Sequence, residues 1–195
     1  MSAVIYGEIP AVEIKPSDAE LSARLSMKRE LIDPLVGAAL CELSRAARIK
    51  FASVRIRVID VRGDEVFLEG TSVRSAALAA YFSGVRETYL FAVTLGSEVD
   101  RLIMKKRALS LTDGFVYDAV ASAMAEAACD AAEDRIHKGE KTKNRFSPGY
   151  GDSPLSLQKD VLALLSADKL VGIKLLESLL MTPMKSITAF AAIVE

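Results

Sequence analysis

The chain has 195 residues, of which 51% are hydrophobic, 6% aromatic and 26% charged. This composition is that of a globular protein, and it excludes a disordered chain, a collagen-like repeat and a small disulfide scaffold. The 25 basic residues balance 26 acidic ones, so no overall charge attracts the protein to nucleic acid or to a membrane surface. The first residues lack the basic and apolar regions of a signal peptide. We therefore expect one cytoplasmic domain spanning residues 1–195.

Residues 1–50 are expected to be largely helical after a short mixed segment at 1–16. Ser-Asp-Ala-Glu at 17–20 is typical of a capping box, in which the serine accepts from the third backbone N–H and the glutamate reaches back. Apolar residues recur at helical spacing over 29–48 and predict a longer helix. Pro34 conflicts with that helix, unless the helix begins close to the proline with Asp33 as its cap.

The period of the sequence then changes to that of strands. Apolar and polar residues alternate over 51–61, which predicts a strand with one solvent-facing side. A turn at 62–64 returns the chain as a second strand over 65–69, so the two form a hairpin. A helix is expected over 72–82 and a further strand over 87–95.

Helices and strands also alternate in the second half of the chain. A polar segment of 18 residues stands there, longer than most connections between elements, and loops of that length are often functional. The expected elements are helices at 97–110 and 112–138 (the latter ended by Gly139), the polar loop at 140–157, a helix at 156–166 and strands at 174–180 and 186–194. Because no repeated strand–helix–strand rhythm is present, we predict an α+β fold with an antiparallel sheet.

Several kinds of chemistry lack the residues they need. His137 is the only histidine, stands in a basic helix end, and has no nucleophile motif near it. Cys41 and Cys129 are far apart in alanine-rich helical contexts, so both are expected to be buried, reduced and unable to complete a zinc site. No Walker loop or Rossmann glycine motif is present. We therefore predict no catalytic residue and no metal ligand.

The most informative segment is 145–154, which reads Arg-Phe-Ser-Pro-Gly-Tyr-Gly-Asp-Ser-Pro. Pro148 and Gly149 fit the central positions of a type II turn, where glycine supplies the positive φ. Arg145 could hold a carboxylate through its planar fork, and Tyr150 offers a ring face and a hydroxyl. On chemistry alone, a rigid turn with a solvated arginine is the simpler interpretation.

This segment resembles the Arg-x-x-Pro-Gly-Tyr-x-x-x-Pro signature of the activation (reactivation) domain of vitamin B12-dependent methionine synthase. Two further blocks resemble that family in the same order: Ala-Ser-Ala-Met-Ala-Glu-Ala at 121–127, and Lys-Leu-Leu-Glu-Ser at 174–178 with Met-Thr-Pro at 181–183 and Ser-Ile at 186–187. The likeness extends over about 90–192, whereas 1–50 is divergent.

The resemblance implies a C-shaped α+β domain with a twisted antiparallel sheet and a shallow groove for S-adenosylmethionine (SAM). Carried over by position, the residues that would bind the cofactor are Arg145, Ser147 through its backbone, and Tyr150. Glu126 stands where the family has an acidic residue near the site, although a surface charge on a helix explains it equally well. A guanidinium of Arg145 locked into an internal pair, with no cavity beside Tyr150, would contradict this assignment.

The resemblance also implies a function in methionine biosynthesis. Such a domain presents SAM to cobalamin, so that one-electron reduction of inactive cob(II)alamin is pulled forward by irreversible methyl transfer. The cobalamin would be carried by a partner, a cobalamin-dependent methionine synthase or related corrinoid methyltransferase, with a flavodoxin or ferredoxin as electron donor. No counterpart of the family's N-terminal aspartate motif or C-terminal tyrosine segment is evident. Two alternatives therefore stay open: a non-catalytic module that docks on a corrinoid protein without SAM, and an unrelated small-molecule binder with this fold.

Overall fold

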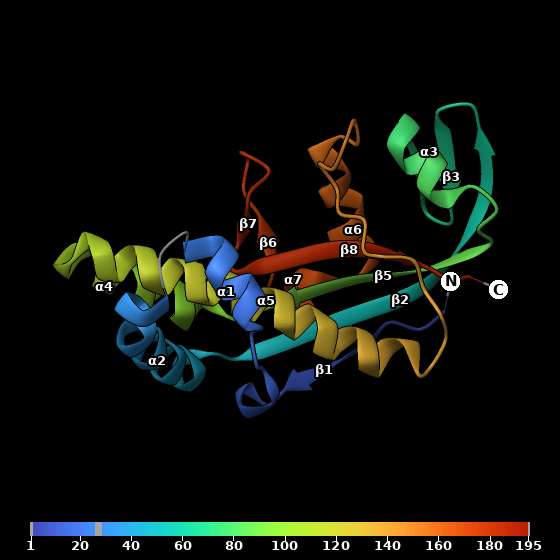
Figure 1. The fold of residues 1–195 in the computed structure, drawn as a ribbon. Helices are drawn as coiled ribbons and strands as arrows, with labels where there is room; N and C mark the ends of the chain where they lie inside the picture. Colours follow the sequence, from blue (N-terminus) through green and yellow to red (C-terminus); the bar gives the residue numbers. More distant parts are fainter. Residues whose placement is uncertain (1, 26–28, 195) are drawn as a thin grey trace.

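The computed structural model describes residues 2–25 and 29–194 and contains an antiparallel sheet with helices on both sides (Figure 1). The strands are β1 (Ile5–Ile9), β2 (Ile49–Arg62), β3 (Glu65–Leu68), β4 (Thr71–Arg74), β5 (Glu87–Thr94), β6 (Lys174–Leu175), β7 (Met181–Thr182) and β8 (Ser186–Ala192). The α-helices are α1 (Asp18–Leu25), α2 (Arg29–Ala46), α3 (Ala76–Phe82), α4 (Ser97–Leu109), α5 (Leu111–His137), α6 (Gln158–Leu164) and α7 (Ala167–Leu170). Short 3-10 helices occupy Ala11–Glu13 and Leu155–Leu157. The predicted α+β class with a twisted antiparallel sheet is confirmed.

The main sheet has the order β4-β3-β2-β5-β8, with β1 paired to the first half of β2 on the side away from β5. The long strand β2 joins the two parts of this sheet, because its second half pairs with β3 across a two-residue turn at Gly63 and Asp64. In Figure 1, α5 runs across one face of the sheet, while β3 and α3 stand together at one end. The strands β6 and β7 form a separate two-stranded sheet.

Apolar side chains fill both faces of the central strands. Along β5, Tyr89, Phe91 and Val93 belong to the core beneath α1, α2, α4 and α5, whereas Leu90 and Ala92 belong to the core beneath α3, α6 and α7. The predicted solvent-facing side of β2 is therefore wrong for its first half: Phe51 and Ser53 are buried because helices cover that face. One side of the strand is exposed to solvent, but this exposure begins only at Arg57.

The N-terminal predictions are partly wrong. Residues 5–9 form an edge strand that a mixed five-residue segment did not indicate. Ser17 does cap α1, accepting from the Glu20 N–H at 3.1 Å, but the Glu20 carboxylate bonds Arg24 Nε at 2.6 Å instead of completing the box. Pro34 lies within α2 and does not mark its start. An internal proline removes one helical hydrogen bond, and the buried face of Val36, Ala39 and Leu43 offsets that loss.

Two predicted elements in the rest of the chain need correction. Residues 71–74 form strand β4, and the predicted helix begins only after Ser75, whose hydroxyl accepts from the Leu78 N–H. The predicted strand at 174–180 is limited to two residues. The chain reverses direction at Leu179, which has a φ of 65°. The segment after this turn forms β7, which pairs antiparallel with β6. The predicted strand at 186–194 is present as β8, but it pairs with β5 in the main sheet.

Candidate functional site

The long loop after α5 is held against the edge of the main sheet. The helix ends at Lys138, which adopts the left-handed conformation (φ 49°), and Gly139 follows at φ 91°. The Lys143 N–H then donates to the Ala192 carbonyl at 2.8 Å, and Phe146 exchanges two backbone hydrogen bonds with Phe190 of β8. The loop therefore extends the sheet beyond β8, and its backbone is satisfied without forming a regular strand.

The predicted turn is present at residues 147–150. The Tyr150 N–H donates to the Ser147 carbonyl at 3.1 Å, and Gly149 has a φ of 91°, the positive value that the third position of a type II turn requires. A side chain at Gly149 would adopt an unfavourable backbone conformation and would approach Leu155 to 3.2 Å. The turn leaves the Tyr150 ring largely exposed, 5.9 Å from the ring centroid of Phe146.

Asp152 fastens the other end of this loop to α3. Its Oδ1 accepts from the Ser75 hydroxyl at 2.5 Å and the Ala77 N–H at 3.0 Å, and its Oδ2 accepts from the Ala76 N–H at 2.8 Å. These bonds satisfy N–H groups at the helix start and lower the pKa of Asp152 to about 2. Sequence reasoning did not assign this residue, although an aspartate between two turns is a common capping residue.

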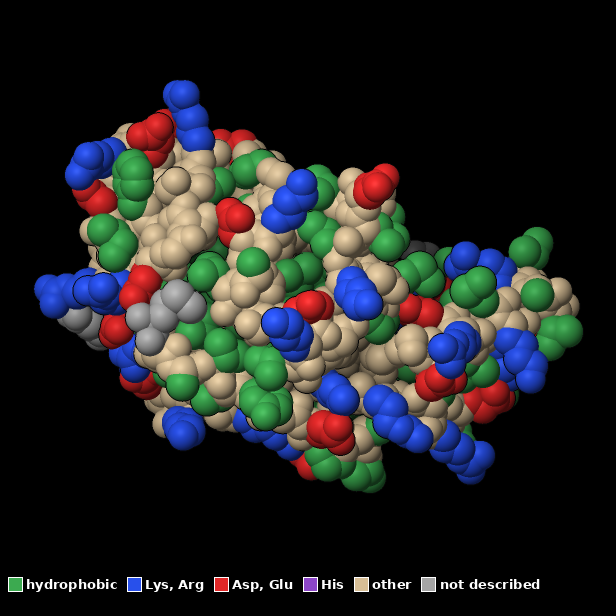
Figure 2. Space-filling model, turned by 180° about the vertical axis from the view of Figure 1, so that it is seen from behind, with side chains coloured by type: hydrophobic (Ala, Val, Ile, Leu, Met, Phe, Trp, Pro, Cys, Tyr) green, Lys and Arg blue, Asp and Glu red, His purple; other side chains and the backbone are tan. Residues whose placement is uncertain are grey.

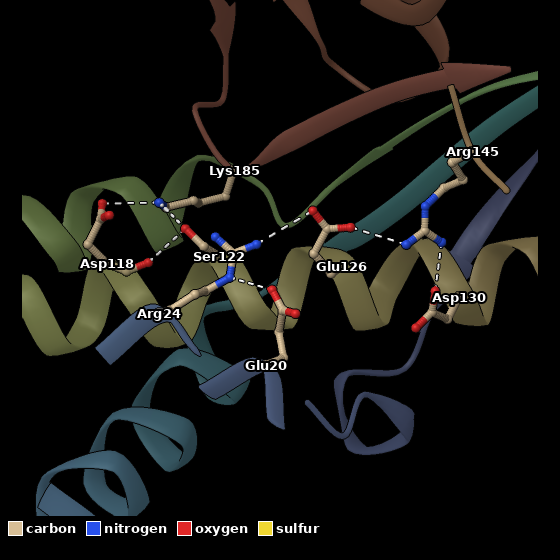
Figure 3. A network of polar contacts seen from close by, with 8 residues as sticks. All are labelled: Glu20, Arg24, Asp118, Ser122, Glu126, Asp130, Arg145 and Lys185. Carbon is tan, nitrogen blue, oxygen red and sulfur yellow. Dashed lines mark hydrogen bonds and ion pairs between the residues drawn. The ribbon is translucent and has the colours of Figure 1, made fainter. Parts of the chain in front are cut away.

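Arg145 reaches from this loop to one face of α5. Its Nη1 donates to Asp130 Oδ1 at 2.6 Å, and its Nη2 donates to Glu126 Oε2 at 3.1 Å (Figure 3). Nη1 also donates to Glu133. We call these three carboxylates the acidic face; their spacing of four and three residues places them on one side of the helix. The acidic face also reaches α1, because Arg24 Nη2 lies 3.6 Å from Glu126 Oε1.

Burial and charge oppose each other in this cluster. Burial disfavours the charged form of Arg145, but the hydrogen bond to Asp130 and the charge of Glu133 outweigh it and raise the pKa of the guanidinium. Burial is also the main cause that raises the pKa of Glu133, and Arg145 counteracts it only in part. Arg145 is therefore a permanent cation, and its partner Glu133 is a carboxylate whose charged form is disfavoured by burial.

A cavity of about 540 Å³ opens beside this cluster, between the second half of α5 and the loop. Its lining is mostly polar and contains more acidic than basic side chains. The residues that line it are Glu126, Asp130, Glu133, Asp134, His137, Thr142, Lys143, Asn144, Arg145 and Tyr150. The ring of His137 stacks on Tyr89 at 5.0 Å between centroids, and burial lowers the pKa of this histidine. The cavity therefore has an acidic wall on α5 and cationic side chains on the loop.

Three of the four predicted binding residues meet at this cavity. Arg145, Glu126 and Tyr150 all line it, whereas Ser147 does not, and the Ser147 carbonyl is already used by the turn. The finding that would contradict the assignment combines an internally paired Arg145 with the absence of a cavity beside Tyr150. Arg145 is paired internally, but a cavity lies beside Tyr150. Ligand contact by these residues stays a prediction. The sequence did not lead us to assign Asp130 and Glu133 to the site, although their spacing from Glu126 indicates that all three lie on one face of a helix.

The two cysteines differ. Cys129 is buried, and burial raises the pKa of its thiol, as expected of a structural residue. Cys41 is exposed, which contradicts the prediction that both are buried. Among residues 2–25 and 29–194, no group of three or more histidine, cysteine and acidic side chains could hold a metal ion.

Cationic side chains also line a second hollow of the surface. Figure 2 shows Lys and Arg side chains gathered at the end of the molecule where α4 lies. In that region Arg45, Arg48, Arg101 and Lys105 line a shallow hollow between α2 and α4. In the part of the chain that the structure describes, no helix has both the length and the apolar character needed to span a membrane.

Comparison with known proteins places the fold. No protein-family model matches the sequence, and no curated protein matches it. Among solved structures, the chain is similar to a MetH reactivation domain bound to AdoHcy, with a TM-score of 0.70 and 20% identity over 97% of this chain and 78% of that chain. The suspected likeness to the methionine synthase activation domain is therefore confirmed for the fold, including its curled antiparallel sheet.

Proposed function

We propose that this protein binds SAM in the cavity between α5 and the loop, and that it is a reactivation-type module for a cobalamin enzyme. One observation carries the proposal: Arg145, Glu126 and Tyr150, which resemble the family's binding residues, line one cavity on the fold of the MetH reactivation domain. That solved domain is bound to AdoHcy, the demethylated form of SAM. The coincidence of residues, cavity and fold supports a ligand of this class.

The residues fit such a ligand in size and in charge. A cavity of 540 Å³ lies within the range of about 300–1,000 Å³ that small-molecule sites usually occupy. The Glu126 carboxylate, which lines the cavity, suits the sulfonium and ammonium groups of SAM. Three of the five N–H groups of Arg145 donate to described carboxylates, so the Nε hydrogen and one Nη2 hydrogen could donate to a ligand carboxylate. Tyr150 would add a ring face at the open side of the cavity.

The protein's own contribution would be to bind and orient. When bound, SAM would supply a methyl group to the reduced cobalt of a corrinoid on a partner protein. Arg145 and Glu126 would fix the amino-acid end of the ligand, and no general acid or base is needed at this site. We propose that the module acts in trans on a methionine synthase or related corrinoid methyltransferase, with a flavodoxin or ferredoxin supplying the electron.

Calorimetric titration with SAM and with AdoHcy tests this function. We expect wild-type protein to bind both, and Arg145→Ala to weaken binding at least about tenfold, equivalent to about 1.4 kcal/mol. Arg135→Ala is the matched control, because Arg135 stands on α5, the helix that Arg145 contacts, but bonds Glu13 and the Ala131 carbonyl outside the cavity. Folded wild-type protein that produces no heat with either ligand up to millimolar concentration would contradict the proposal.

A second function is favoured by the state of Arg145. Because three carboxylates already pair with its guanidinium, the module could dock on a corrinoid protein without binding SAM. Co-purification with a corrinoid methyltransferase in the absence and presence of SAM separates the two. Capture that is independent of SAM, together with no heat in the titration, would favour the docking module.

A further inference from the structure

The acidic face holds more negative charge than Arg145 can neutralise. Both hydrogens of Nη1 are taken, one by Asp130 and one by Glu133, and Nη2 serves Glu126. Glu126 has a second cation beside it, Arg24, whereas no such second cation is seen for Asp130 or Glu133 among the described residues. The two carboxylates on Nη1 therefore depend on Arg145 for their compensation.

In this arrangement, a ligand carboxylate must compete with Asp130 and Glu133 for Arg145. A carboxylate that approached Arg145 with all three acidic side chains in place would bring a fourth negative charge to a single guanidinium. Like charges at this distance repel. Because Arg145 is half-buried, solvent screens that repulsion poorly. Exchange, in which a ligand oxygen takes the place of Asp130 or Glu133 on Nη1, avoids this accumulation of charge.

We propose that Asp130 and Glu133 hold Arg145 closed in the unliganded protein and set the affinity of the site by competing with the ligand's carboxylate. This inference rests on the proposed function and assigns to two further residues a role opposite to that of Arg145. The exposed Asp130 is free to swing into solvent when displaced. Glu133 is mostly buried, so its displacement leaves a desolvated carboxylate, and it is the stronger competitor.

The test is a calorimetric comparison of Asp130→Asn and Glu133→Gln with wild type, using AdoHcy as the probe. Each replacement removes a charge while keeping shape, so the fold is preserved, and a thermal melt verifies it. We expect AdoHcy to bind about threefold or more tightly to each variant, with the larger effect for Glu133→Gln. Asp134→Asn is the matched control: Asp134 lines the same cavity but makes no bond to Arg145, and its replacement should change affinity less than about twofold.

A second probe, 5′-methylthioadenosine, isolates the carboxylate. It has the adenosine and thioether of AdoHcy but lacks the amino-acid end, so its affinity should not respond to either replacement. Weaker AdoHcy binding by Asp130→Asn and Glu133→Gln would show that these residues position Arg145 for the ligand, and would overturn the inference. Equal tightening by Asp134→Asn would overturn it in favour of a general charge effect.

The outcomes also separate this inference from the proposed function. Binding by wild type with no gain in the variants refutes the competition and leaves the function standing. Binding by Glu133→Gln where wild type shows none supports the competition. If neither probe binds to the wild type or to any variant, both the proposed function and the competition are refuted.

Discussion

Two ionic clusters on the same side of α5 are built on opposite principles. In the first half of the helix, the Lys185 ammonium lies 3.0 Å from Asp118 Oδ1 and donates to Ser122 Oγ at 2.8 Å, so one cation meets one carboxylate and one hydroxyl. In the second half, Arg145 meets the three carboxylates of the acidic face. Figure 3 shows the Lys185 cluster and, farther along the same helix, Arg145 with Glu126 and Asp130.

The difference follows the position of the cavity. The Lys185 cluster fastens the start of β8 to α5, and no cavity residue takes part in it. The Arg145 cluster borders the open cavity, where its surplus of negative charge remains available to a cationic ligand. We expect the charges to balance in a cluster that only holds two elements together. In a cluster that binds a ligand, we expect an excess of one charge that the ligand balances.

Removal of the cation from the unbalanced cluster should have the largest effect on stability. Arg145→Ala leaves Glu133 desolvated without its partner, so we expect the free energy of unfolding to fall by about 2 kcal/mol at pH 7, less than for a fully buried pair because Asp130 is exposed. The folded-state pKa of Glu133 is raised, so protonation favours the folded state. The deficit should therefore shrink as the pH falls from 7 toward the ordinary value of 4.5.

Urea denaturation between pH 4.5 and 7 measures this effect. The double variant Arg145→Ala with Glu133→Gln is the control, since it lacks the Glu133 carboxyl and should lack the recovery. If the loss of unfolding free energy in Arg145→Ala grew as the pH fell, a group other than Glu133 would be responsible for the pH dependence.

A smaller loss is expected in the balanced cluster. Lys185→Met keeps the length of the side chain but removes its charge, leaving the half-exposed Asp118 without this partner. We expect a loss of about 1 kcal/mol with no change in AdoHcy affinity. Denaturation and calorimetry on the same variant check both statements. A loss of affinity equal to that of Arg145→Ala would remove the functional distinction between the clusters.

The smallest effect should come from the link to α1. Arg24 and Glu126 are both about one-third exposed and 3.6 Å apart, so Arg24→Gln should lower stability by less than about 0.5 kcal/mol. Ligand affinity should change less than about twofold, because Glu126 keeps its bond to Arg145. A larger loss of affinity would make α1 part of the binding site and extend the functional cluster across two helices.

The sequence predicted the long helices and central strands within about three residues, because periodic apolar faces dominate such segments. It failed where local signals are short. The five-residue strand β1 and the four-residue strand β4 depend on pairing with β2 and β3, which no local pattern reveals. At 174–180 the apolar residues suggested a strand, but the left-handed conformation of Leu179 reverses the chain.

The candidate site was predictable only in part, for a similar reason. The segment around Arg145 and Tyr150 could be identified from its residues, and the spacing of the acidic face was legible within α5. What the sequence did not indicate is that Arg145 points at that face, because the direction is fixed by the pairing of Phe146 with Phe190. The cavity exists only once the loop lies along β8.

The loop that carries Arg145 and Tyr150 is tied at two ends to different parts of the molecule: Phe146 to β8, and Asp152 to the first turn of α3. A shift of the tyrosine would therefore pull on the hairpin of β3 and β4 through that turn. The position of Tyr150 at the cavity is thus coupled through the backbone to the opposite end of the sheet.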